Sequence, residues 1–441
     1  MTAPDQLFAA AVAATGWPAL LPAHRRDGSE QPTGRPSCVD ALALDDGLVL
    51  AVVADGRERT YPVPLVVRRD GTGGVEVRRA EPGDGAAEAL VARLAADRRD
   101  EGAFQVSRWH HREVTGERGI TVDQTNESVV VGERAIVKWL VVADEGPHPA
   151  PTMLTALVQA GFGGTPRPWG AVEWRSARGS APRLLALAVE HLPGAVDGWT
   201  WAVADLRAAA AGGDPGRAAE VGRRTGELVA SFHAALAGTA RPATAAEVAG
   251  WRTRAHVDLD RALEVTNGAA RDVLAAMAAS VRRAFDSVPV DAGTPVLRVH
   301  GDLHVGQVLR MDTDRGTSYS LTDFDGNPVL PAAERLREQP AALDAAGMAQ
   351  SLVHAALVVR RHHSDLDGGA VERAGELAAA SFLDAFRVGL GEHADLLDER
   401  LLRPFRLQQV CREFIYAATH LPRWSYVPEA ALPMLLREDR P

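Results

Sequence analysis

The hydrophobic pattern of this chain changes once, near residue 192, and that change limits the folds available to it. Before it, short apolar runs such as Leu48–Val53 and Leu184–His191 are separated by turn signals, as in β-strands. From about residue 200, apolar residues recur at spacings of three and four, as in helices. Strands followed by helices are typical of an α+β protein. The length of 441 residues favours two or three domains.

Three regions follow from this pattern. Residues 1–97 predict a small α/β unit rich in hairpins. Residues 98–191 predict a second strand-rich unit, in which the runs 128–131 and 135–141 form a hairpin around a tight connection. Residues 192–441 predict a helical unit. Long helical patterns recur in it at residues 217–236, 253–286, 341–363, 370–390 and 404–420.

One segment without helical period, residues 296–325, interrupts the helical region. It contains HGDLHVGQ from His300 and LTDFDG from Leu321. Protein kinases use D-x-x-x-x-N followed by D-F-G for phosphoryl transfer. In the same order, Asp302 would orient the acceptor hydroxyl and take its proton, while Gln307 and Asp323 would hold Mg²⁺, which prefers hard oxygen ligands. Each alone could cap a turn or end a strand, but the conjunction favours catalysis.

Two histidines, His300 and His304, flank the predicted base. An H-x-x-x-H zinc site would need a third ligand, and none lies near them in the sequence. We therefore expect one of them to bond the loop backbone or Asp323.

The hairpin carries a second candidate, Lys138. A compact ammonium group on a strand suits the α- and β-phosphates of a nucleotide. The chain is rich in arginine and poor in lysine, which favours function over an ordinary exposed lysine. There is no G-x-G-x-x-G loop, so Asn126 and Ser128 are expected to cover the phosphates. In kinases a helix glutamate pairs with this lysine. Asp144 and Glu145 lie earlier in the chain than that glutamate would, so the sequence does not identify the acidic partner of Lys138.

These motifs resemble those of the maltokinase-type sugar kinases and, more distantly, the aminoglycoside phosphotransferases. The resemblance includes the stretch from Asp123 to Lys138, Asp344 to Met348, and the C-terminal Tyr416 and Leu421 to Trp424. Residues 1–97 resemble the maltokinase cap only in length and hairpin content. The resemblance implies a bilobal, protein-kinase-like α+β fold with an N-terminal cap and a helical C-lobe, and ATP and Mg²⁺ as cofactors. We also expect Glu190 and Leu192, where a strand ends, to bind the nucleotide.

The acceptor is expected to contact the last helical region. Gln409, Glu413, Tyr416 and His420 are spaced by four, three and four, which places them on one helix face, and Trp424 follows. Hydrogen-bonding groups beside an aromatic ring suit a sugar. Tyr416 and Trp424 are as well explained as core anchors with polar tips. His304 and Asp325 complete the predicted substrate contacts.

The choice of sugar rests on departures from the maltokinases. Ala417 replaces the acid that maltokinases tend to carry there, and DFDGNP replaces their glutamate-rich run. The string REFIYAATHLPRWSY from Arg412 resembles the glucosamine kinases. That resemblance implies phosphorylation of D-glucosamine at the 6-hydroxyl. The 2-ammonium group would pair with Glu413, Asp344 or Asp325.

Three alternatives remain. The nearest is a maltokinase that makes maltose 1-phosphate. An aminoglycoside phosphotransferase would need more acids than this C-terminal helix carries. A catalytically silent kinase-fold binding module would be expected to have lost Asp302, Gln307 or Asp323, and all three are present.

Charge and composition limit the classes of molecule that this chain is expected to bind. The formal net charge of -10 disfavours nucleic acid and anionic membranes as partners. We find no apolar run of about 18 residues and no positively charged start typical of a signal peptide. Cys38 and Cys411 give no disulfide framework. We therefore expect a cytoplasmic protein whose partner is a small sugar, compatible with a monomer.

Overall fold

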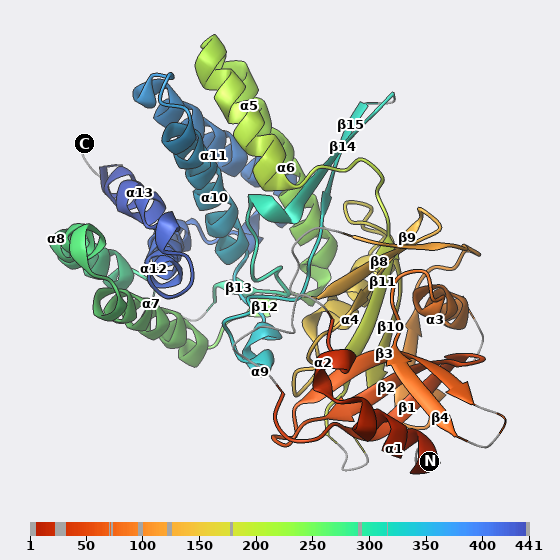
Figure 1. Cartoon of the computed structure of the whole chain (residues 1–441). Helices are drawn as coiled ribbons and strands as arrows, with labels where there is room; N and C mark the ends of the chain where they lie inside the picture. The colour runs from red at the N-terminus through yellow and green to blue at the C-terminus, as the bar shows by residue number, and fades with distance from the viewer. Residues whose placement is uncertain are drawn as a thin grey trace. The chain divides into compact units, whose positions relative to one another are not determined.

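The computed structural model describes residues 6–22, 32–69, 71, 74–95, 100–120, 126–176, 180–289, 293–314 and 316–437. The chain divides into two compact units. The first comprises Met1–Val158, Pro166–Pro193 and Val329–Leu336, and the second comprises Gln159–Thr165, Gly194–Pro328 and Arg337–Pro441. Figure 1 shows that the first unit holds the two large sheets and the second most of the helices. The finer division at residue 97 stays a prediction.

The first unit begins with a four-stranded antiparallel sheet, in the order β1-β2-β3-β4. Its strands are β1 (Ser37–Asp45), β2 (Leu48–Ala54), β3 (Thr60–Arg69) and β4 (Val75–Arg79). Two short helices, α1 (Gln6–Thr15) and α2 (Trp17–Leu20), bury Phe8, Val12 and Leu20 against one face of this sheet. The predicted strands at the N-terminus are thereby confirmed.

The second sheet of this unit has seven strands, in the order β5-β6-β10-β11-β9-β8-β7. They are β5 (Asp100–Glu101), β6 (Phe104–Arg108), β7 (Glu117–Gly119), β8 (Glu127–Val131), β9 (Ala135–Trp139), β10 (Pro168–Trp174) and β11 (Arg183–Glu190). A shared core joins both sheets and α3 (Ala86–Ala95), and α4 (Pro149–Gln159) follows β9. The β8–β9 hairpin is confirmed. The sequence did not reveal β10, because all seven of its residues are buried and it shows no alternation.

Long helices build most of the second unit. They are α5 (Gly198–Gly212), α6 (Pro215–Leu236), α7 (Ala245–Val265), α8 (Gly268–Asp286), α10 (Ala341–His362), α11 (Gly368–Leu390), α12 (Leu402–Thr419) and α13 (Tyr426–Arg437). The prediction of one helical stretch over residues 253–286 was wrong. Thr266 and Asn267 are extended, with ψ of 154° and 172°, and Gly268 has a φ of 53°, so α7 ends and α8 begins there.

Short elements complete the structure. They are α9 (Ala332–Arg335), β12 (Arg241–Pro242), β13 (Pro295–Val296), β14 (Val308–Thr313), β15 (Gly316–Leu321), η2 (Ala237–Thr239), η3 (Val305–Gln307), η4 (Gly391–Leu396), η5 (Glu399–Leu401) and η6 (Pro422–Trp424). In the described part of the chain, α10 alone is long and apolar enough to cross a membrane, and 83% of its apolar window is buried inside the protein.

Candidate active site

The register of the β8–β9 hairpin places the predicted phosphate-binding residues. Ser128 lies opposite Lys138, and Lys138 lies opposite Leu187 of β11. Val137 and Trp139 are buried in the core shared by both sheets. Because side chains alternate along a strand, Lys138 points to the other face, where it is partly exposed. The hairpin therefore presents an ammonium group and a hydroxyl group side by side.

Asn126 lies at the start of β8. Its Oδ1 accepts a hydrogen bond from Val141 N–H at 3.2 Å, which ties the start of this strand to the chain leaving β9. The motif residues Asp123 to Thr125 lie outside the described residues. The roles of Asn126 and Ser128 toward phosphates stay predictions.

Two acids near Lys138 have partners of their own. Asp144 forms an ion pair with Arg335 at 3.1 Å, and Glu145 forms one with Arg183 at 2.8 Å. Glu190 accepts from Arg167 N–H at 3.2 Å, while its own N–H donates to the Arg167 carbonyl at 2.7 Å. Leu192, two residues on, is partly buried. The assignment of Glu190 and Leu192 to the nucleotide stays a prediction.

The base candidate Asp302 follows a sharp turn in the second unit, at which Gly301 has a φ of 81°. Burial raises the pKa of Asp302 to about 6; His300 opposes this shift and the nearby carboxylate of Asp323 adds to it. An aspartate of this pKa is ionised at pH 7, yet is a stronger base than an exposed one.

A single buried carboxylate holds the backbone ahead of this base. Asp344 of α10 accepts from His300 N–H at 2.8 Å, from Gly301 N–H at 2.9 Å and from His233 Nε2 at 3.0 Å. Burial opposes ionisation of Asp344, but these hydrogen bonds and the neighbouring histidines outweigh it and lower its pKa. Asp344 is 1% exposed and fully engaged, so the prediction that it could pair with a substrate ammonium group was wrong.

The same face of α10 contacts the rest of the loop. Ser351 Oγ accepts from Val305 N–H at 2.8 Å. A Cβ on Gly347 would lie 2.5 Å from the Leu303 carbonyl oxygen, so only glycine permits this approach. Asp344, Gly347 and Ser351 are spaced by three and four, so they form one stripe on the helix, and this stripe contacts the loop that carries Asp302.

The two metal-ligand candidates lie across a strand pairing. Thr322 N–H donates to the Gln307 carbonyl at 2.9 Å, at the end of the β14–β15 hairpin, so Thr322 lies opposite Gln307 and Asp323 is the next residue along the chain. Asp323 is exposed and has a φ of 64°, a conformation that costs a non-glycine residue free energy and often marks a functional site. A carboxylate and a side-chain amide supply oxygen donors of the kind that Mg²⁺ prefers, so both residues suit the metal role, which stays a prediction.

The flanking histidines have structural partners. His300 Nε2 donates to the Thr322 carbonyl at 2.9 Å, and its ring packs on Phe324 with a centroid distance of 5.1 Å. The expected bond from a histidine to the loop backbone is thus confirmed. Burial lowers the pKa of His304 to about 4, with the charge of His300 as a second cause. The ring of His304 is therefore neutral at pH 7, and its Nδ1 accepts from Gly306 N–H at 3.1 Å.

A second, partly buried carboxylate, Glu413 of α12, forms the centre of the candidate acceptor site. Trp424 Nε1 donates to one of its oxygens at 2.7 Å, and Gln409 Nε2 donates to the other at 3.2 Å. Burial raises the pKa of Glu413, these two hydrogen bonds oppose the shift, and the carboxylate of Asp302 adds to it. The base and this carboxylate are thus close enough to interact electrostatically.

The other predicted substrate residues are placed differently. Tyr416 is 46% exposed, His420 is exposed, and the two rings lie against each other at 5.6 Å. Asp325 is partly buried, two residues after Asp323. Their contact with a substrate stays a prediction.

Sequence reasoning missed Trp199 in the first turn of α5. Its ring centroid lies 5.9 Å from that of His304 and 5.9 Å from that of Trp424. A Cβ on the preceding Gly198 would lie 1.6 Å from the Val305 carbonyl oxygen, so this glycine lets the helix start directly on the catalytic loop. The helix cap Asp197 followed by glycine and tryptophan was the available signal.

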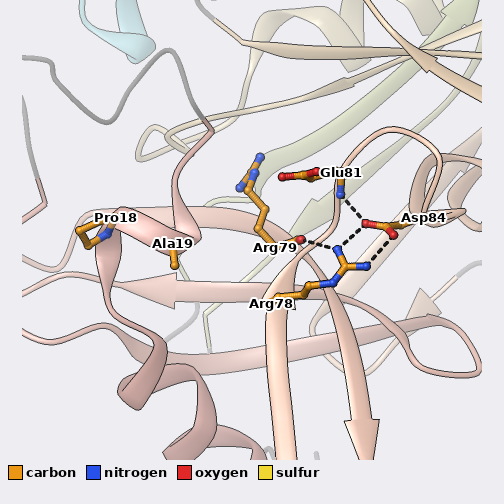
Figure 2. A pocket seen from close by; sticks show the side chains of 6 residues that line it. All are labelled: Pro18, Ala19, Arg78, Arg79, Glu81 and Asp84. Carbon is orange, nitrogen blue, oxygen red and sulfur yellow. Dashed lines mark hydrogen bonds and ion pairs between the residues drawn. The ribbon is translucent and has the colours of Figure 1, made fainter.

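A hollow away from these residues lies at the edge of the first sheet and has a volume of about 510 Å³ (Figure 2). Arg78 forms two hydrogen bonds of 2.6 Å with Asp84, and Arg79 pairs with Glu127. Partners within the chain hold both guanidinium groups, and none of the predicted site residues lines this hollow.

Comparison with known proteins gives consistent results. No family model matches the chain. It is 45% identical over 437 residues to a glucosamine kinase of Streptacidiphilus jiangxiensis, with 97% of each chain covered. It is 46% identical over 410 residues to one of Mycolicibacterium smegmatis, with 91% of this chain and 98% of that one covered.

A solved glucosamine kinase in complex with glucosamine, ADP and inorganic phosphate matches with a TM-score of 0.83 at 43% identity, covering 99% of this chain and 100% of that one. A second crystal form of glucosamine kinase gives 0.85 at 42% identity, with 98% and 99% covered. The α+β, kinase-like fold class predicted from the sequence is confirmed.

Proposed function

We propose that this chain, which belongs to the glucosamine kinase family, transfers the terminal phosphoryl group of ATP to the 6-hydroxyl group of D-glucosamine. The observation that carries this proposal is the partly buried carboxylate of Glu413, which Trp424 and Gln409 orient and whose pKa the nearby charge of Asp302 helps to raise. A cationic amino sugar between the two acids would relieve their repulsion. A neutral sugar would offer Glu413 no counter-charge and so would gain no charge-assisted hydrogen bond.

Each residue has a defined part in the proposed reaction. Asp302 accepts the proton of the acceptor hydroxyl as the oxygen attacks phosphorus. Gln307 and Asp323 would hold Mg²⁺, which neutralises phosphate charge when bound. Lys138 would contribute a further positive charge at the phosphates. Positioning and electrostatics supply most of the catalysis in such a site.

The test is ADP release from the purified protein with Mg-ATP and glucosamine, N-acetylglucosamine, glucose, maltose or an aminoglycoside. We expect strong turnover with glucosamine only. In Glu413→Gln, KM for glucosamine should rise about 10- to 100-fold, the value of one charge-assisted hydrogen bond, while KM for ATP stays unchanged.

Glucose is the matched control, because it lacks the ammonium group. Glu413→Gln should leave the weak use of glucose as it is and so reduce the preference for glucosamine. Turnover of maltose by the wild type, or an unchanged preference in the variant, would contradict the proposal.

We also propose that the enzyme works in the cytoplasm on a small sugar, without nucleic acid or membrane partners, and that a monomer suffices for its activity. The two cysteines, Cys38 and Cys411, are free thiols, in keeping with a reducing compartment.

A further inference from the structure

Trp199 is not a core residue, although it lies only two positions before one. It lies in the first turn of α5, behind the helix cap Asp197, which accepts from Thr200 N–H at 3.1 Å. Trp201, two residues on, is 1% exposed and donates its indole N–H to the Val308 carbonyl at 2.9 Å. Trp199 is only partly buried. The same helix turn thus carries one tryptophan that anchors the core and one that does not.

The catalytic loop is shaped to receive the Trp199 ring. A Cβ on Gly306 would lie 2.6 Å from Trp199 Nε1, so the indole packs directly over the loop backbone at this glycine. The ring also lies 5.9 Å from that of His304, at an interplanar angle of 32°. Both neighbours belong to the segment between Asp302 and Gln307, so Trp199 contacts the loop between the base and a metal-ligand candidate.

Trp199 also meets Trp424 edge to face, with centroids 5.9 Å apart and an angle of 84°. Trp424 is the residue whose Nε1 holds the Glu413 carboxylate at 2.7 Å. Such aromatic pairs favour a fixed geometry by about 0.5–1.5 kcal/mol. Trp199 therefore packs against Trp424, and Trp424 orients Glu413, the carboxylate proposed to bind the ammonium group.

We infer that Trp199 determines acceptor specificity: with Trp424 it forms an aromatic corner that fixes Glu413 and leaves no room for a substituent on the amino group of the sugar. This inference rests on the proposed function. An N-acyl group removes the positive charge and adds bulk beside Glu413, so the corner selects the free amino sugar by both charge and size. The Trp199 ring is a specificity-determining group and takes no part in proton transfer.

The experiment compares kcat/KM for glucosamine and N-acetylglucosamine in the wild type, Trp199→Ala and Trp199→Phe. In Trp199→Ala, the ratio of N-acetylglucosamine to glucosamine use should rise at least about tenfold, the value of one bulky contact in a specificity pocket, with KM for ATP unchanged. Trp199→Phe keeps an aromatic edge against Trp424 and should shift the ratio less. A core role alone would change stability without changing this ratio.

The matched control is Trp251→Phe. Trp251 of α7 packs edge to face on Phe405 at 6.4 Å and is 9% exposed, so it loses a comparable contact outside the acceptor site. In Trp251→Phe, the ratio of N-acetylglucosamine to glucosamine use should stay at the wild-type value. If Trp199→Ala does not fold, Trp199→Phe and Trp199→Leu carry the measurement.

An unchanged ratio in folded Trp199 variants of an enzyme that uses glucosamine would overturn the inference and leave the proposed function intact. A wild type that does not phosphorylate glucosamine would overturn the proposed function itself.

Discussion

The two units hold their functional residues in different ways. Lys138 and Ser128 face each other in a regular hairpin, where many backbone hydrogen bonds fix the face that each side chain takes. Asp302 lies in an irregular loop, and one carboxylate, Asp344, binds the two backbone N–H groups just ahead of it. Many backbone hydrogen bonds together fix the positions of Lys138 and Ser128 in the sheet. The position of Asp302 in its loop depends on a few buried polar side chains. Substitutions behind the loop should therefore cost both stability and activity, and substitutions on the hairpin should cost activity alone.

The largest effect is expected from Asp344→Ala. It leaves two buried N–H groups and His233 without their acceptor, which should lower the free energy of unfolding by about 3–5 kcal/mol and reduce kcat strongly. Thermal melting and kcat at saturating substrates measure both effects. Asp344→Asn keeps one acceptor oxygen and should lose less.

Asp398 provides the control for this change. It also accepts hydrogen bonds in the second unit, from Thr294 Oγ1 at 2.8 Å and from Arg400 N–H at 3.1 Å. Asp398→Ala should lower the melting temperature and leave kcat near the wild-type value. If Asp344→Ala melted at the wild-type temperature, the dependence of the loop on one carboxylate would be wrong.

Lys138→Met should lower activity strongly and stability little, the reverse of the pattern expected for Asp398→Ala. Methionine keeps the apolar stem and the strand register, so we expect less than about 1 kcal/mol of change in stability. Loss of the ammonium group should lower kcat/KM for ATP at least about 100-fold. Arg134→Met, on the exposed turn of the same hairpin, should leave kcat/KM unchanged. A large loss of stability in Lys138→Met would remove the contrast between the two units.

The smallest effect concerns pH. The raised pKa of Asp302, about 6, predicts that kcat/KM for glucosamine falls below pH 6, approaching tenfold per pH unit, because only the ionised carboxylate accepts the proton. Its pKa in the folded state lies above the ordinary value of 3.8. Protonation of Asp302 therefore favours the folded state, and this contribution is lost as pH rises from about 4 to 6.

Asp302→Asn isolates that contribution. The variant should be more stable than the wild type at pH 7, by up to about 3 kcal/mol, and this advantage should shrink toward pH 4. A pH profile of kcat/KM that is flat down to pH 4.5 would exclude a raised pKa for the base.

The sequence predicted those features that depend on residues close together in the chain. Alternation and turn residues revealed the β8–β9 hairpin, and the spacing of Asp302, Gln307 and Asp323 gave the catalytic candidates. The role of Asp344 was missed because its partner His300 lies 44 residues away, and nothing in the sequence marks that contact. For Trp199 the sequence signalled only a helix start at Asp197, and the contact with Trp424 arises in the folded chain.

The bond from His300 to the Thr322 carbonyl has a consequence for the distance between two carboxylates. The same ring packs on Phe324, so the histidine two residues before the base holds both neighbours of Asp323. One side chain thus links the segment that carries Asp302 to the segment that carries Asp323. We therefore expect the separation between these two carboxylates to be a property of the folded chain before any substrate binds, so that loss of the His300 ring would change the distance between the proposed base and the proposed metal ligand.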